Sequence, residues 1–154
     1  MNSRILLFIL FILATSCISV EICDDEYESV MVAKFMTLKD GTPADSTVSS
    51  LSLYGIREGQ SDTLLYTATN VFEVPLDPHH DFTHFVLLLD EQSDTLELNH
   101  HQEIYMISYD CGFGNLFTIE SIAYHSGMIK SHEIKNDLVD AKTEEDDVHI
   151  WLFL

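Results

Sequence analysis

The stretch Ser50-Leu51-Ser52-Leu53-Tyr54 places leucines at every second position, and the same alternation returns at Thr95-Leu96-Glu97-Leu98. Successive side chains of a β-strand point to opposite faces, so this period of two predicts strands with one buried and one solvated face. Between them, Phe85–Leu89 is apolar at every position. That run predicts a central strand covered on both faces.

Runs of strand length, rich in apolar, β-branched and aromatic residues, recur along the rest of the chain. They lie at Val30–Thr37, Val48–Ile56, Thr63–Thr67, Val71–Leu76, Phe82–Leu89, Thr95–Asn99, Glu103–Tyr109, Leu116–Tyr124, Met128–Lys135 and Asp147–Phe153. Turn residues separate them, as at Asp40-Gly41-Thr42-Pro43. The pattern predicts an all-β domain over residues 30–154, an antiparallel β-sandwich of the immunoglobulin-like kind.

The composition limits the partners that the protein can have. The 154 residues include 26 Asp and Glu but only 7 Lys and Arg, which gives a net charge of −19. Such a chain is repelled by nucleic acid and by anionic membrane surfaces, so no nucleic-acid partner is expected. The hydrophobic fraction of 46% is too high for a disordered acidic tail, and it predicts a folded core.

Residues 1–16 have the features of a secretory signal peptide. Arg4 precedes the apolar run Ile5–Leu13, and the small residues Ala14-Thr15-Ser16 follow it. The apolar run is shorter than the about 20 residues that a membrane-spanning helix needs. We therefore expect export, with residues 17–29 as an acidic tether in front of the domain.

Small residues directly before Cys17 resemble the bacterial lipobox, although Ala14 stands where a leucine is usual. The resemblance implies cleavage before Cys17 and attachment of lipid to this residue, which would anchor the protein in a membrane. The alternative is ordinary signal cleavage near Ser16, with Cys17 left free or paired.

Export implies an oxidising compartment, where disulfides persist. If Cys17 carries lipid, Cys23 and Cys111 form the one remaining pair, and they enclose 111 − 23 = 88 residues. Pairing of Cys17 with either cysteine remains the alternative. A nucleophilic role of Cys111 is disfavoured, because the neighbouring Asp110 opposes formation of the thiolate.

Several segments together resemble a family of small lipoproteins of Bacteroidetes that has no known function. They are Cys17 after its export signal, Leu51-Ser52-Leu53-Tyr54-Gly55, Phe72-Glu73-Val74-Pro75-Leu76, Cys111-Gly112-Phe113 and a closing strand that contains Trp151. The resemblance implies an exported, sandwich-like domain in which Cys23 and Cys111 are paired. It implies no known activity, cofactor or catalytic residue.

Three histidines are candidate metal ligands, because His79, His80 and His84 lie within six residues of one another. On a strand, His80 and His84 would be roughly 13 Å apart, too far to share a zinc ion. A second pair, His100 and His101, is expected in a hairpin turn. We therefore favour exposed turn histidines and expect no metal and no cofactor.

Motifs of catalysis are missing from the sequence, which has no Gly-x-Ser-x-Gly elbow and no motif for a catalytic carboxylate pair. The sequence therefore predicts a non-enzymatic lipoprotein, an interaction or structural module of the cell envelope. We expect it at the outer membrane, with its periplasmic or surface face and its protein or glycan partner left open. The alternative is a glycan- or metal-binding module at the cell surface. Such a module would use the histidines or exposed aromatic residues among Tyr105, Tyr109, Trp151 and Phe153.

Overall fold

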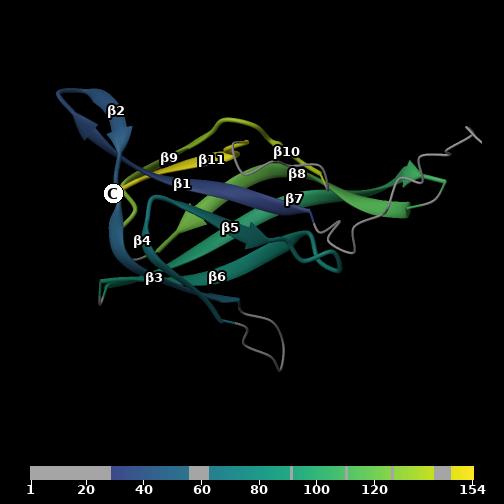
Figure 1. The fold of residues 1–154 in the computed structure, drawn as a ribbon, viewed down its shortest axis with the longest axis horizontal. Helices are drawn as coiled ribbons and strands as arrows, with labels where there is room; N and C mark the ends of the chain where they lie inside the picture. Colours follow the sequence, from purple (N-terminus) through teal and green to yellow (C-terminus); the bar gives the residue numbers. More distant parts are fainter. Residues whose placement is uncertain (1–28, 56–62, 91, 110, 126, 141–146) are drawn as a thin grey trace, which may run out of the picture.

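The computed structural model describes residues 29–55, 63–90, 92–109, 111–125, 127–140 and 147–154. Within these ranges the chain forms eleven strands and no helix. The strands make two sheets that pack face to face (Figure 1). The predicted all-β, mainly antiparallel sandwich is confirmed, whereas its immunoglobulin-like character stays a prediction.

The first sheet is built around β1. It has the order β2-β1-β11-β9, and β5 also pairs with β1. Its strands are β1 (Val30–Lys39), β2 (Thr42–Asp45), β5 (Val71–Pro75), β9 (Ser131–Ile134) and β11 (Ile150–Phe153).

The two long edges of β1 take different partners. β11 runs parallel to β1 along Ala33–Met36, and β5 and β2 share the other edge. The predicted turn after β1 is confirmed, because Asp40 and Gly41 both have positive φ, 53° and 78°, as a two-residue hairpin requires. Pro43 belongs to β2 rather than to this turn, and β2 is an edge strand, which tolerates proline.

The second sheet is larger and has the order β10-β8-β7-β6-β3-β4. Its strands are β3 (Val48–Gly55), β4 (Thr63–Thr69), β6 (Phe82–Leu89), β7 (Gln92–Ser108), β8 (Gly112–Tyr124) and β10 (Leu138–Val139). The core lies between the two sheets. It includes Phe35, Phe72, Leu53, Leu87 and Leu98, and the rings of Phe35 and Phe72 stack with their centroids 4.8 Å apart.

The central position predicted for Phe85–Leu89 is confirmed, because β6 lies between β7 and β3. The prediction that both its faces are covered is wrong. Phe85, Leu87 and Leu89 are buried, but Val86 and Leu88 on the outer face are only half-buried. The first sheet packs on the inner face alone, and the outer face is shielded by neighbouring side chains of its own sheet, since Val86 pairs with Tyr54 and Thr95.

The hairpin turn predicted at His100 and His101 is also wrong. β7 continues through these residues, and its register against β8 shifts between Asn99 and His100. The extra residue of this β-bulge is Glu120 on β8, and β7 is not interrupted. Burial on β7 continues at every second residue from Asp94 to His100, so His100 is buried while His101 is exposed.

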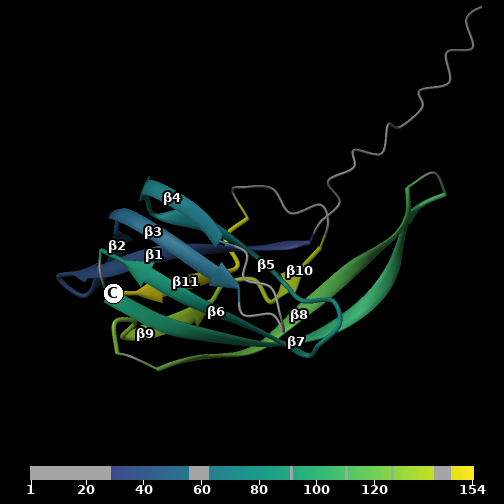
Figure 2. The same ribbon diagram turned by 90° about the horizontal axis from the view of Figure 1, so that it is seen from below.

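The hairpin of β7 and β8 extends beyond the rest of the sandwich (Figure 2). β6 pairs with β7 only as far as Asn99, and β10 pairs with β8 only at Phe117 and Thr118. Between these limits and the turn after Ser108, β7 and β8 have no further partner among the described strands, and they form a two-stranded ribbon.

Replacing Phe35 by alanine should lower the free energy of unfolding by about 3–5 kcal/mol, because the change leaves a cavity where the ring stacks on Phe72. Urea unfolding followed by circular dichroism measures this loss. Leu38→Ala on the same strand is the control. Leu38 is exposed, so a change within about 0.5 kcal/mol is expected there. Equal losses in the two variants would contradict the placement of the core.

Candidate functional site

Four large hydrophobic side chains are exposed close together at the end of the β7–β8 hairpin. The exposed fraction is 72% for Ile104, 46% for Met106, 97% for Tyr109 and 73% for Phe113. We call these four residues the hairpin tip. Exposed apolar clusters of this kind mark interaction surfaces more often than isolated apolar residues do.

The strand register puts three residues of the hairpin tip on one face. Met106 lies opposite Phe113, and Ile104 lies opposite Asn115. Counting in steps of two along β8, this is the face that carries the buried Phe117. The core-facing side of the hairpin therefore continues past the body of the protein and becomes exposed there.

The other face of the ribbon carries His101 and the exposed Glu103 near the body of the protein, and apolar side chains near the turn. Tyr105 and Ile107 lie across Gly114, where an added Cβ atom would be 3.3 Å from Cε1 of Tyr105 and 2.8 Å from Cδ1 of Ile107. Glycine at this position thus leaves room for the two side chains to pack along the strand. The ribbon consequently carries apolar groups on both faces.

Cys111 lies in the turn between β7 and β8, and its sulfur forms a disulfide. The other two cysteines of the sequence, Cys17 and Cys23, lie outside the described residues. The pairing of Cys23 with Cys111 and the lipidation of Cys17 therefore stay predictions. The same holds for the signal peptide at residues 1–16 and for the tether up to residue 28.

The described chain begins beside the same ribbon. The Ser29 hydroxyl donates a hydrogen bond of 2.5 Å to the carbonyl oxygen of Asn115 on β8, and β1 starts at the next residue. The residues that precede Ser29 therefore join the domain at the end from which the hairpin projects.

The histidines considered as metal ligands lie at a different rim of the molecule. His79 and His80 are exposed in the turn before β6, and His84 is on β6 itself. Nδ1 of His80 is 3.1 Å from a carboxylate oxygen of Asp77, and Nε2 of His84 is 2.9 Å from one of Glu97.

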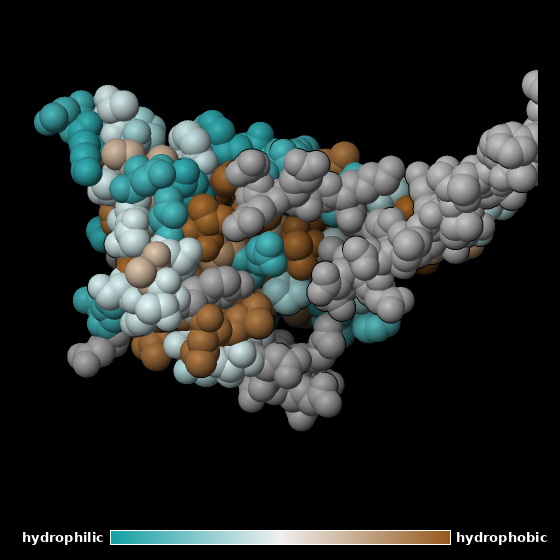
Figure 3. Space-filling view, in the orientation of Figure 1, coloured by the Kyte–Doolittle hydropathy of each residue, from teal (hydrophilic) through white to brown (hydrophobic). Residues whose placement is uncertain are grey.

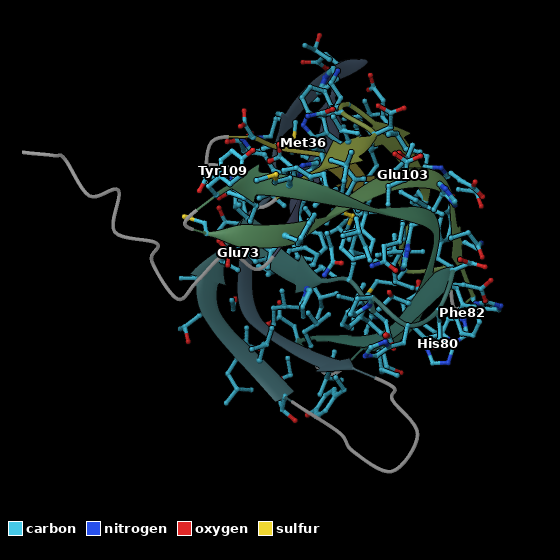
Figure 4. The ribbon with its side chains drawn as sticks, turned by 90° about the vertical axis from the view of Figure 1, so that its right-hand side faces the viewer. Met36, Glu73, His80, Phe82, Glu103 and Tyr109 are labelled. Atoms are coloured by element: carbon cyan, nitrogen blue, oxygen red, sulfur yellow. The ribbon has the colours of Figure 1, made fainter. Side chains whose placement is uncertain are left out.

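The side chain of Phe82 is next to that of His80, and both point away from the core (Figure 4). Its ring centroid lies 5.6 Å from that of His80 and 4.9 Å from that of His84. Among the described residues, no group of three histidine, cysteine or carboxylate side chains could hold a metal ion. The structure thus brings two of the three histidines to one aromatic ring and pairs each with its own carboxylate.

His149 is buried and uses both ring nitrogens. The Val32 backbone N–H donates to its Nδ1 over 3.0 Å, and its Nε2 lies 3.1 Å from the carbonyl oxygen of Leu138. Because Leu138 offers only an acceptor, Nε2 carries the proton and the ring is neutral. Burial lowers the pKa of His149 below its ordinary value, although the hydrogen bond to Leu138 and the nearby Asp147 partly oppose this.

His100 is the second buried histidine. Its Nε2 is 2.8 Å from Oγ1 of Thr83, and its ring meets that of Phe117 edge-on. Burial lowers its pKa, against the opposing effect of Asp77 and Asp81. Its Nδ1 has no hydrogen-bond partner among the described residues.

Asp94 is a buried carboxylate that sequence reasoning missed. It accepts hydrogen bonds from the backbone N–H groups of Thr95, His125 and Ile129, and so holds the segment after β8. The alternation of Leu96 and Leu98 already put position 94 on the buried face. That was the signal which could have found it.

A shallow hollow of about 850 Å³ lies at the end of the sandwich where the chain ends. Its polar groups include Asp90, which accepts hydrogen bonds from the backbone and the hydroxyl of Ser50, and Lys130, whose ammonium donates to the carbonyl oxygen of Met128. These groups hold the local backbone. Within the described lining they form no nucleophile–base pair of the kind that covalent catalysis requires.

The aromatic residues considered as stacking platforms divide between core and surface. Phe153 is buried, and Trp151 is half-buried beneath the Lys135 ammonium, which is 4.1 Å from its ring centroid. Tyr105 is half-buried, and only Tyr109 of the four is fully exposed. Elsewhere on the surface, Figure 3 shows hydrophilic side chains around the β1–β2 turn and hydrophobic ones over β3 and β4, where Leu64 and Leu65 are exposed.

The fold and its surface define a small acidic β-sandwich protein with a projecting apolar hairpin. Residues 50–152 match the family of unknown function DUF6452, and the chain belongs to this family. The match spans β3 to β11 and therefore includes the whole hairpin. Comparisons with curated proteins and with solved structures gave no match. No helix among the described residues is long and apolar enough to cross a membrane.

Peptide mapping under non-reducing conditions should give a disulfide-linked peptide that joins Cys23 to Cys111. A bridge that closes 88 residues stabilises a protein by about 4–5 kcal/mol in the chain-entropy model. Cys23→Ser should therefore lower the midpoint of urea unfolding markedly. A peptide that links Cys17 to Cys111 would contradict the pairing and, with it, the lipidation of Cys17.

Stability should fall as the pH drops below about 6.5, the ordinary histidine value. The folded pKa of His149 and of His100 is lowered, so the unfolded chain binds more protons below 6.5. The contribution of the two neutral imidazoles to the free energy of unfolding is therefore complete above pH 6.5. It is lost as the pH falls toward their lowered pKa values in the folded protein. Urea unfolding between pH 7.5 and 5.5 measures this window.

In the same experiment, His149→Ala should lose about 2–4 kcal/mol at pH 7.5, since two buried backbone groups lose their partner. It should also show a shallower pH dependence than the natural chain. The control is His84→Ala, because the His84–Glu97 pair is half-exposed. This control should lose less than about 1 kcal/mol and keep the full pH dependence. An unchanged slope in His149→Ala would refute the role given to this imidazole.

Proposed function

We propose that the protein is an exported, lipid-anchored and non-enzymatic module of the bacterial envelope, related to the small lipoproteins of Bacteroidetes, and that it acts by contact through its surface. We assign it to the outer membrane. The sequence of residues 1–17 carries this proposal, because a charged start, a short apolar run and small residues directly before a cysteine are the features of an export signal with lipid attachment.

The short distance between anchor and domain supports a role close to the membrane. Cys17 and Ser29 are 12 residues apart, and a chain of that length spans at most about 40 Å. A lipid on Cys17 would therefore hold the sandwich near the bilayer, with the end that carries the hairpin closest to the anchor.

A contact role also fits the way in which the polar interior is used. The buried carboxylate of Asp94 and the buried imidazole of His149 both hold backbone segments in place. Exposed apolar residues, in contrast, gather at the hairpin tip. The groups that can contact a partner are thus the exposed apolar side chains of the surface, and not the polar side chains of the interior.

The anchor can be tested by expressing the full chain in a bacterial host with lipoprotein processing. The natural chain should stay in the membrane fraction after an alkaline wash, and mass spectrometry should show an acylated N-terminal Cys17. Cys17→Ser should lose both properties. Cys23→Ser is the matched control and should keep them. A mature N-terminus at another residue, without lipid, would overturn the proposed anchor.

A further inference from the structure

The hairpin tip is unusual within this chain for its lack of charge. From Ile104 to Ile119 the sequence contains one acidic residue, Asp110, and no lysine or arginine, although the whole chain has 26 acidic residues. The same segment carries the four exposed side chains of the hairpin tip. Charge is thus missing where apolar exposure is highest.

We infer that the hairpin tip inserts into the interface of a lipid bilayer and forms a second membrane contact beside the anchor. The inference rests on the proposed function for the identity of that membrane. The ligand is a lipid surface without net charge, because a protein of charge −19 is repelled by anionic headgroups.

The position of the ribbon in the molecule supports this occupant. Ser29, the first described residue, is hydrogen-bonded to Asn115 of the ribbon. Cys111 at its turn forms a disulfide, and the remaining cysteines of the sequence both precede Ser29. With Cys23 as the partner, this disulfide is only six positions from Cys17 in the sequence, a reach of at most about 22 Å. The hairpin tip would then be held next to any lipid on Cys17.

Apolar residues on both faces of the ribbon favour lipid over a protein partner. Ile104, Met106 and Phe113 lie on one face, and Tyr105 and Ile107 on the other. A protein that docks on one side would leave the second face in water. A bilayer interface surrounds the end of a ribbon, so it takes up side chains from both faces at once.

The unpaired edges of the ribbon limit the depth of insertion. Past Asn99, β7 has no partner other than β8 among the described strands, although the His100 N–H donates to the Asp81 carbonyl oxygen and the Asn115 carbonyl oxygen accepts from Ser29. Outer backbone groups nearer the turn that have no such partner need water or headgroups. The ribbon therefore stays at headgroup depth, and only the side chains of the hairpin tip reach the acyl chains. Tyr109, at the apex, has the amphipathic ring that is typical of this layer.

The experiment introduces a tryptophan at the hairpin tip, as Phe113→Trp, in the full chain. The matched control is Leu65→Trp on β4, where the native side chain is equally exposed, at 75% compared with 73% for Phe113. Both variants and the natural chain, which reports the background of Trp151, are mixed with phosphatidylcholine vesicles that contain brominated acyl chains. Bromine quenches tryptophan only by contact.

Emission from Phe113→Trp should shift to shorter wavelength and fall about twofold, because the indole enters the interface, while Leu65→Trp stays at the background. A companion variant, Met106→Ser with Phe113→Ser, should bind vesicles more weakly than the natural chain and unfold at the same urea concentration, because both side chains are exposed. Quenching should weaken when phosphatidylglycerol replaces part of the phosphatidylcholine.

The quenching measures contact between the tryptophan at position 113 and the acyl chains. This readout does not depend on whether Cys17 carries a lipid. Quenching without acylation would leave the hairpin contact in place and overturn the anchor. Acylation without quenching would leave the anchor and overturn the hairpin contact. Absence of quenching together with a dimer, detected by ultracentrifugation and lost in Phe113→Ser, would overturn the inference in favour of a second copy of the chain.

Discussion

The rest of the structure depends on one buried imidazole, that of His149, which connects the two sheets. Its Nδ1 accepts the N–H of Val32 in β1, and its backbone N–H donates back to the Val32 carbonyl oxygen. Its Nε2 faces the Leu138 carbonyl oxygen in β10, a strand of the opposite sheet. Only the neutral ring with its proton on Nε2 can accept the N–H of Val32 and also donate to the carbonyl oxygen of Leu138. The closing segment of the chain is therefore fixed on β1 and on the second sheet at the same time.

The unequal size of the two sheets explains why an apolar surface remains. β7 has 17 residues and β8 has 13, whereas the longest strand of the first sheet, β1, has 10. A strand rises about 3.3 Å per residue, so the hairpin of β7 and β8 extends beyond the end of the first sheet, which covers it. Side chains that continue the core pattern, such as Ile104 and Phe113, then have no strand of the described part of the chain above them. Their exposure follows from strand length and not from a break in the sequence pattern.

Much of the sandwich could be predicted from alternation, because the apolar side chains of a half-buried strand must recur at every second position, as Leu51 and Leu53 or Leu96 and Leu98 do. Two contacts distant in sequence could not be predicted in this way. The polar run around His100 resembles a turn, but it pairs with β8, and the imidazole of His100 packs against Thr83 and Phe117. The sequence pattern predicts no strand at Leu138–Val139, yet Val139 is buried, because β10 pairs with β8. Of the candidate site, the sequence indicated only Tyr109 and Tyr105, as candidate stacking residues of the alternative function, because the grouping of the hairpin tip depends on the register of the hairpin.

Charge and shape together give the proposed membrane contact a direction. The acidic body is repelled by any anionic surface, and repulsion between exposed charges acts over about a Debye length, roughly 8–10 Å. The ribbon carries its apolar end away from the body (Figure 2), on a segment with almost no charge of its own. A lipid on Cys17 alone would leave the domain free to rotate on its tether. A second contact at the hairpin tip would hold the domain at two points on the membrane, the lipid and the hairpin tip. The opposite end of the sandwich, with the hydrophilic β1–β2 turn, would then face the aqueous phase.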